Sequence, residues 1–247
     1  MRAARTMSAA GQLPLFAVRR SARARRARLT VTDTGEALVV LPARAPETLA
    51  AELVARHAGW VERHQRRTAA EQAVLSARPS LSEGRVLTLR GVAHRVVVVH
   101  GAAGSRSTVG AEVHSAPAIV VRLAAAERAT VRALVERWLR AEARGDISAA
   151  VVGRAAQMGL AAGRLAIRDQ RTRWGSASPR GELSFSWRLV LCPPDVLDYV
   201  VVHELAHLRW RGHGARFWAL VRRHVPGADD HRRWLIAEHR TLHAALD

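Results

Sequence analysis

One segment near the C-terminus restricts the fold of this chain more than any other. Residues 201–213 have the sequence V-V-H-E-L-A-H-L-R-W-R-G-H, an H-E-x-x-H motif that follows a hydrophobic run. On an α-helix, side chains four positions apart lie on the same face, so His203 and His207 can both direct an imidazole nitrogen at one zinc ion. Glu204 lies beside that ion and can accept the proton of an attacking water. The motif therefore predicts a core helix that carries a metal site.

His213 follows the motif and is a candidate third metal ligand. It lies between Gly212 and Gly214, where the chain can turn back towards the metal. Three protein ligands leave the fourth position of a zinc ion for water and substrate. The alternative is a buried helix whose histidines are satisfied by hydrogen bonds. The hydrophobic run at 196–202 and the aromatic segment at 217–221, which offers a second helix to pack beneath the first, favour the metal site.

The charged residues exclude several kinds of chemistry and suggest a class of partner. The 247-residue chain has a formal net charge of +18, and its 39 Lys/Arg side chains are all arginines. Without lysine, the chain cannot contain a phosphate-loop lysine, a Schiff-base lysine or a Ser–Lys dyad. The positive charge raises the expectation of contact with a nucleotide or nucleic acid, but for the densest arginine run a solvated edge is favoured over a binding patch. The densest arginine run comprises Arg19, Arg20, Arg23, Arg25, Arg26 and Arg28.

The single cysteine and the N-terminus indicate the compartment. Cys192 has no partner for an internal disulfide, and its apolar neighbours predict a buried structural thiol, in keeping with a reducing compartment. The uncharged stretch at 7–18 is interrupted by polar residues and proline and lacks a convincing signal-peptide cleavage site. No apolar run reaches membrane-spanning length. We therefore expect a cytoplasmic protein with no membrane partner.

Hydrophobic periodicity divides the chain into a strand-rich part and a helix-rich part. Strands are expected at 16–20, 27–32, 36–41, 86–90, 93–100, 118–123, 165–168 and 182–191, with a turn at 33–35. Helices are expected at 46–68, 127–160 with a bend at Gly145-Asp146, 194–209, 215–224 and 229–242. The pattern predicts an α+β protein with a flexible tail over 1–14, a β-rich N-terminal region with one helix over 15–120 and a catalytic domain over 121–247.

Further motifs around the metal segment carry a resemblance to a known family. The segments Arg171-Thr172-Arg173-Trp174-Gly175-Ser176, Trp187-Arg188-Leu189, His203-Glu204-Leu205-Ala206-His207 and His213 together resemble the YgjP-type metal-dependent hydrolases, which are zincin-like and related to the SprT-like and WLM peptidases. The resemblance implies a zincin-like catalytic domain in which His203, His207 and His213 bind the metal. It also implies that Glu204 is the catalytic carboxylate. The chain departs from the family pattern at Ala177, where cysteine is usual, and at Trp210 and Gly212, where histidine and asparagine are frequent.

These features together predict a zinc-dependent hydrolase, and we favour a metallopeptidase. Zn²⁺ would polarise the scissile carbonyl, Glu204 would assist attack by the zinc-bound water, and strand 182–187 would pair with an extended peptide or protein substrate. Arg173 is the candidate for stabilising negative charge that develops in the reaction, with a structural hydrogen bond as the alternative. The family resemblance also implies a competing activity, a metal-dependent pyrophosphatase acting on the nucleotide UTP. A third hypothesis is a nucleic-acid-associated protein with a structural metal site, which Glu204 and the open fourth position argue against.

Overall fold

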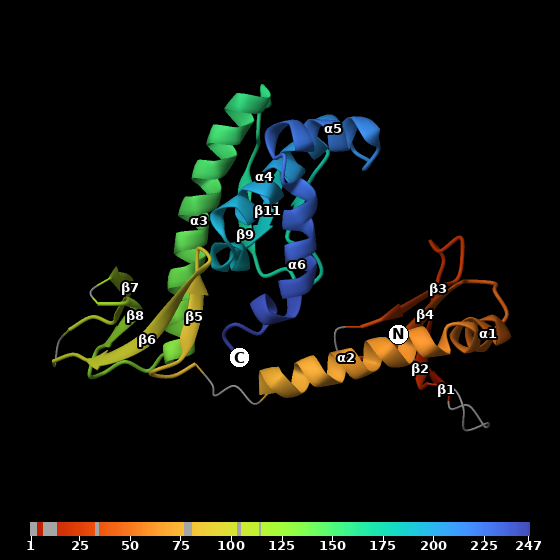
Figure 1. Cartoon of the computed structure of the whole chain (residues 1–247), viewed down its shortest axis with the longest axis horizontal. Coiled ribbons are helices and arrows are strands. Elements are labelled where there is room, and N and C mark those ends of the chain that lie inside the picture. Colours follow the sequence, from red (N-terminus) through yellow and green to blue (C-terminus); the bar gives the residue numbers. More distant parts are fainter. Residues whose placement is uncertain (1–3, 7–13, 33–34, 77–80, 103–104, 114) are drawn as a thin grey trace. The chain divides into compact units, whose positions relative to one another are not determined.

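Buried side chains form two separate hydrophobic cores, one in each of two units. The units are Met1–Arg78 and Pro79–Asp247, whose helices and strands are labelled in Figure 1. The computed structural model describes residues 4–6, 14–32, 35–76, 81–102, 105–113 and 115–247. The division between the units falls earlier than the boundary expected near residue 120, because strands at 86–123 contribute to the core of the helix-rich part. Residues 33–34 of the expected turn, and residues 1–3 and 7–13 of the expected tail, lie outside the described residues.

The first unit contains a four-stranded sheet followed by two helices. The strands are β1 (Ala4–Thr6), β2 (Phe16–Ser21), β3 (Arg28–Val31) and β4 (Ala37–Pro42), in the order β1-β2-β4-β3, and the helices are α1 (Thr48–Arg56) and α2 (Ala58–Ser76). Val39 and Leu41 alternate into the core, where Val54 of α1 also packs. A break at His57 divides the region expected to form one helix. Arg20 donates hydrogen bonds to two backbone carbonyls of the β4–α1 connection, so part of the arginine run stabilises the fold.

The second unit begins with another four-stranded sheet. Its strands are β5 (Val86–Leu89), β6 (Val92–His100), β7 (Thr108–Val113) and β8 (Pro117–Leu123), in the order β5-β6-β8-β7. The sequence did not predict β7, whose side chains are exposed or only partly buried. Both four-stranded sheets have a parallel central pair flanked by antiparallel outer pairs, and each is followed by a helix. The two units therefore repeat one strand topology.

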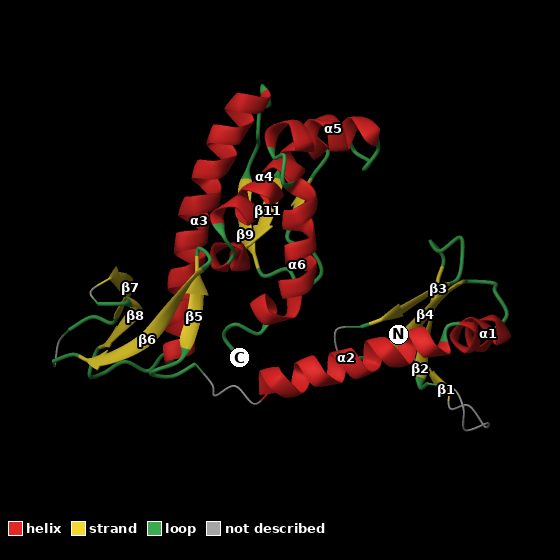
Figure 2. Ribbon diagram, in the orientation of Figure 1, coloured by secondary structure: helices red, strands yellow, loops and turns green. Residues whose placement is uncertain are grey.

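Helix α3 (Val131–Met158) is the long helix of the second unit and packs against its strands and against α4 (Pro194–Arg209) (Figure 2). Thr130 caps its N-terminus by accepting a hydrogen bond from the amide of Ala133 over 3.2 Å, and Gly159 ends the helix in the left-handed conformation at φ 63°. The bend expected at Gly145-Asp146 is wrong, since α3 continues through these residues. Its buried face, which includes Ile147, contacts strands of both sheets of this unit, so burial outweighs the low helix propensity of one glycine.

A small three-stranded sheet follows α3 in the sequence and precedes the three C-terminal helices. It consists of β9 (Leu165–Arg168), β10 (Gly175–Ala177) and β11 (Leu183–Ser186), in the order β10-β11-β9. The strand expected at 182–191 ends at Ser186 and continues as a 3₁₀ helix, Trp187–Leu191. Because β11 is the central strand and pairs on both sides, the expectation that it would pair with a substrate is wrong. The edge strands of this sheet are β10 and β9.

Three helices complete the chain, namely α4 (Pro194–Arg209), α5 (Ala215–His224) and α6 (Ala228–His243). Cys192 precedes α4 as a buried free thiol, as expected, and burial raises its pKa. In the part of the chain that the structure describes, none of the helices has the length and apolar character of a bilayer-spanning segment. The mixture of helices with three small sheets confirms the α+β class.

Candidate metal centre

Helix α4 holds the two histidines of the H-E-x-x-H motif on one face. Pro194 begins the helix, where its missing N–H costs no hydrogen bond, and Val201, Val202 and other apolar residues on the helix are buried. This burial fixes the rotation of α4 about its axis. The imidazoles of His203 and His207 consequently lie together, with ring centroids 5.0 Å apart.

His213 joins this pair from the connection between α4 and α5. Its Nε2 lies 3.2 Å from Nε2 of His203, and the potential ligand atoms of the three histidines all lie within 4.8 Å of one another. Two nitrogen ligands of a tetrahedral zinc ion are roughly 3.3 Å apart, as follows from Zn–N bonds of about 2.0–2.1 Å. No fourth histidine, cysteine or carboxylate within the described ranges joins the group. The donor set therefore fits zinc with one position open.

Neighbouring groups orient the imidazoles. The Nδ1–H of His207 donates to the carbonyl oxygen of Trp210 over 3.1 Å, and because a carbonyl only accepts, Nε2 keeps its lone pair for a metal. Nδ1 of His203 is buried without a hydrogen-bond partner among the described residues. The ring of Phe217, on α5, lies 4.9 Å from His203, 4.6 Å from His207 and 4.8 Å from His213 between centroids. The departure from the family pattern at Trp210 leaves this carbonyl contact intact.

The electrostatics of the site favour neutral imidazoles. Burial, reinforced by the nearby His207 and His213, lowers the pKa of His203 to about 3. Burial also lowers the pKa of His207. A metal ion binds the lone pair of an unprotonated imidazole, so both shifts keep these side chains ready for a metal at neutral pH.

Glu204 is buried against the small sheet. Only 7% of the residue is exposed, and burial raises the pKa of its carboxyl group to about 7, while the charge of Arg173 acts in the opposite direction. A Cβ atom at Gly175 would lie 2.6 Å from Cγ and 2.8 Å from Oε1 of Glu204. The absence of a side chain at Gly175 therefore makes room for the carboxyl group. No local sequence pattern predicts this role of Gly175, which lies on β10.

Arg173 lies in the loop before β10 with an exposed side chain. Its charge acts on Glu204, but across the described residues the two form no ion pair. Tyr199, one turn before His203 on α4, is buried, and its ring centroid lies 5.9 Å from that of His203. Burial raises the pKa of the Tyr199 hydroxyl. Thus the three histidines gather at one point, while Glu204 and Arg173 lie around the adjoining strand β10.

Parts of this chain resemble known proteins. Part of the chain is similar to the crystal structure of the metallopeptidase zymogen abylysin of Pyrococcus abyssi, with 20% sequence identity and a TM-score of 0.34, over 37% of this chain and 93% of that chain. No curated protein is significantly similar to the chain in sequence. The model of the family described as YgjP-like, metallopeptidase domain, matches residues 25–238, a range that includes helix α4 and the small sheet. The chain therefore belongs to the YgjP-like metallopeptidase family.

Proposed function

We propose that this metallopeptidase is a zinc enzyme that cleaves peptide bonds with Glu204 as general base. The observation that carries the proposal is the grouping of His203, His207 and His213, whose ligand atoms lie within 4.8 Å, beside a buried carboxyl group. Zinc bound by these histidines supplies Lewis-acid polarisation of the scissile carbonyl and acidifies water.

The side chains of the site have distinct parts in this reaction. Glu204 accepts a proton from the attacking water and delivers it to the leaving amine as the carbon–nitrogen bond breaks. Its burial, which raises the pKa of the carboxyl group, suits a group that both takes and returns a proton. The guanidinium of Arg173 stabilises negative charge as it develops on the carbonyl oxygen of the substrate.

The substrate peptide pairs with the outer edge of β10. Two hydrogen bonds between β10 and β11 define which backbone groups remain for it: Ser186 N–H donates to the carbonyl of Trp174, and Ser178 N–H donates to the carbonyl of Glu182. In an antiparallel pair such bonds recur at every second residue, so the backbone groups of Gly175 and Ala177 face away from β11. An extended peptide can pair with these groups and lie beside Glu204.

Metal analysis tests the ligand assignment. We expect about one zinc ion per chain in the wild type, and its loss in the His203→Ala and His207→Ala variants, since each removes one of three protein ligands. His100→Ala is the matched control, because this exposed histidine lies on β6. A wild-type protein that binds no zinc would refute the proposed centre.

Turnover separates the proposed peptidase from the UTP pyrophosphatase and from a protein with a structural metal. Wild type and Glu204→Gln are compared on a peptide library and on UTP. We expect the wild type to cleave peptides and Glu204→Gln to retain zinc while its kcat falls by about 100-fold or more. Turnover of UTP alone would overturn the peptidase, and turnover of neither substrate would favour a structural metal. Unchanged kcat in Glu204→Gln would exclude Glu204 as the base.

A further inference from the structure

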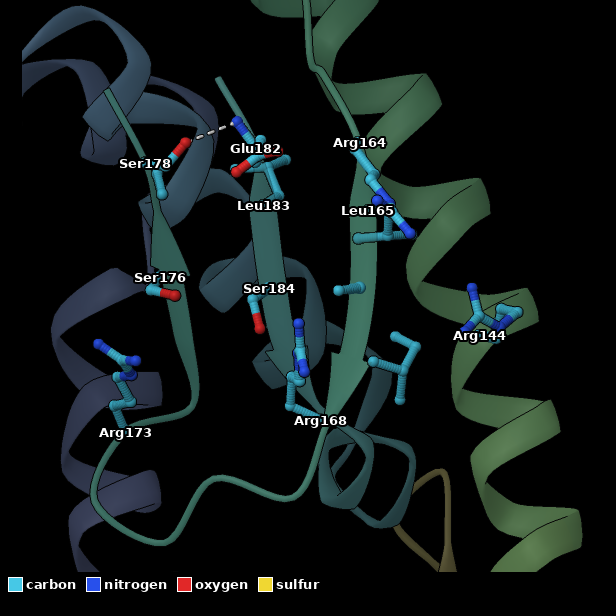
Figure 3. Close-up of a pocket in the computed structure, with 13 residues that line it drawn as sticks. Arg144, Arg164, Leu165, Arg168, Arg173, Ser176, Ser178, Glu182, Leu183 and Ser184 are labelled. Atoms are coloured by element: carbon cyan, nitrogen blue, oxygen red, sulfur yellow. Dashed lines mark hydrogen bonds between the residues drawn. The ribbon is translucent and has the colours of Figure 1, made fainter. Parts of the chain in front are cut away.

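A hollow of about 690 Å³ lies on the small sheet, lined by residues of β9, β10, β11 and α3 (Figure 3). Ser176 on β10 and Ser184 on β11 lie at its floor, and Ala166 on β9 also lines it. These three side chains are small, which leaves space above the strands. Four arginines surround this floor: Arg144, Arg164, Arg168 and Arg173.

The strand register places this hollow on the face of the sheet opposite Glu204. Ser176 is paired with Ser184, and Ser184 with Ala166, so the three side chains project from the same face. Gly175 precedes Ser176 on β10, and a side chain there would point at Glu204. Strand β10 therefore has the candidate base on one face and the hollow on the other.

The arginines of the hollow carry positive charge that is not held in ion pairs with other described residues. Among the residues that the structure describes, none of these four side chains takes part in an ion pair or a side-chain hydrogen bond. Arg140 and Arg154, on the same helix as Arg144, are by contrast each paired with a carboxylate. Glu182 is the single acidic residue lining the hollow. The hollow thus has an excess of positive charge and room for several side chains.

We propose that this hollow binds acidic side chains of a peptide paired with β10, an inference that rests on the proposed peptidase function. Successive side chains of an extended peptide alternate between the two faces of the sheet that it joins. Every second side chain of such a peptide therefore projects on the Ser176 face, closest to Arg173. Long acidic side chains extend from there across β10 and β11 towards Arg164 and Arg168, which belong to β9 or immediately precede it. Guanidinium groups bind carboxylates through paired, charge-assisted hydrogen bonds. The substrate class is accordingly a peptide with Asp or Glu at alternate positions.

The lining residues favour carboxylates over the phosphates of a nucleotide. Phosphate sites commonly use backbone N–H groups of a helix N-terminus or of a glycine-rich turn. Here Arg144 lies in the middle of α3, and Arg164 and Arg168 belong to β9 or immediately precede it. The backbone N–H groups of Ser184 and its neighbours on β11 are engaged in a sheet that pairs on both sides. Recognition in the hollow therefore depends on side chains.

The test uses pairs of peptides that differ only by Glu or Gln at alternate positions. We expect wild type to have a higher kcat/KM for the acidic peptide, mainly through KM. In the charge-reversal variant Arg164→Glu/Arg168→Glu, the acidic-to-neutral ratio of kcat/KM should fall by about tenfold or more, because two positive charges of the hollow become negative. The control Arg106→Glu/Arg128→Glu changes the same charge at two exposed arginines outside the hollow and should keep the wild-type ratio. Arg173 is left unchanged because it also acts on Glu204.

A binding measurement separates failure of the hollow from failure of the peptidase. Fluorescence anisotropy of the labelled acidic peptide is measured with zinc-loaded Glu204→Gln, with and without Arg164→Glu/Arg168→Glu. Binding that is lost on Arg164→Glu/Arg168→Glu is called hollow-dependent. If such binding of the acidic peptide is found but the wild type cleaves no peptide, the proposed hollow is supported and the peptidase is refuted. Cleavage with equal acidic-to-neutral ratios in wild type and variant would overturn the hollow and leave the peptidase standing. Hollow-dependent binding of UTP but not of the acidic peptide would also overturn the inference. Thermal unfolding shows whether the charge reversal disturbs folding. If it does, the milder Arg164→Gln/Arg168→Gln variant replaces it and should lower the acidic-to-neutral ratio of kcat/KM by a smaller factor.

Discussion

Replacing Gly175 by alanine would place a methyl group in space that Glu204 occupies. The added Cβ would lie 2.6 Å from Cγ, 2.8 Å from Oε1 and 2.9 Å from Cδ of Glu204. Ordinary contacts between such atoms are about 3.5–4.0 Å, so the Glu204 side chain has to move by roughly 1 Å. The backbone at Gly175 does not have positive φ, so alanine fits the local conformation itself. The substitution therefore acts on the carboxyl group more than on the strand.

The expected cost in stability is small and the expected cost in activity is large. Alanine gains about 0.5–1 kcal/mol over glycine in a strand, whereas overpacking costs about 1–3 kcal/mol, so the free energy of unfolding should fall by roughly 0–2 kcal/mol. A displacement of about 1 Å at a catalytic group lowers the rate by about 100-fold. Zinc binding should persist, because the three atoms nearest to the added methyl group all belong to Glu204 and not to a histidine.

The assay combines kcat/KM, zinc content and urea unfolding for wild type, Gly175→Ala, Glu204→Gln and the double variant. The double variant should be no slower than Glu204→Gln, since both changes remove the same function. Gly153→Ala is the matched control, because its added methyl group meets nothing within 4 Å on α3. Wild-type kcat/KM in Gly175→Ala would refute the catalytic importance of this contact.

Two further predictions concern the free energy of unfolding. Burial, with neighbouring cationic groups, lowers the pKa of His243 to about 4, so the unfolded chain takes up a proton first and stability should be lost as pH falls from about 6.5 through 4. After allowance for the partial exposure of His243, the free energy of unfolding should fall by about 1–2 kcal/mol over this pH range. Measured by urea unfolding, this free energy should depend less on pH in His243→Leu than in the wild type or in the exposed-site control His100→Leu. Arg90 donates three hydrogen bonds of 2.8 Å to two carboxylates on α3, and Arg90→Ala should lower the free energy of unfolding by about 1–2 kcal/mol. Arg66→Ala, which removes one exposed ion pair within a helix, should cost less than about 0.5 kcal/mol, and equal losses for the two variants would contradict this interpretation.

Helix α4, which carries His203 and His207, could be predicted because the sequence patterns that specify it are local. The expected bounds 194–209 and 215–224 agree with α4 and α5, since hydrophobic periodicity and Pro194 specify the first helix and Gly214 precedes the second. The spacing of His203 and His207 follows from helix geometry once the helix is recognised. The position of His213 beside them depends on the path of the connecting segment. The structure brings its Nε2 to 3.2 Å from that of His203, although spacing alone left this open.

Features that depend on contacts between distant segments could not be predicted. The role of Gly175 requires knowledge that Glu204, from a later helix, packs against β10. The hollow requires arginines from α3, from β9 and from the loop before β10 to meet on one side of the sheet. Strand β7 lacks a strong pattern because its side chains remain largely accessible. In each case, the sequence contains the residues but no local signal of their neighbours.

The segment Trp174-Gly175-Ser176 explains why such different residues occur side by side. The Trp174 ring packs on α6, with its centroid 5.2 Å from that of His243, and its carbonyl accepts a hydrogen bond from the amide of Ser186. These contacts fix the register of β10, so that Gly175 faces Glu204 and Ser176 lies in the hollow. A slip of one residue would exchange the two faces and direct a serine side chain at the buried carboxyl group. Trp174 is bulky, Gly175 has no side chain and Ser176 is small. This order therefore places the candidate base and the proposed substrate-binding hollow on opposite faces of one short strand.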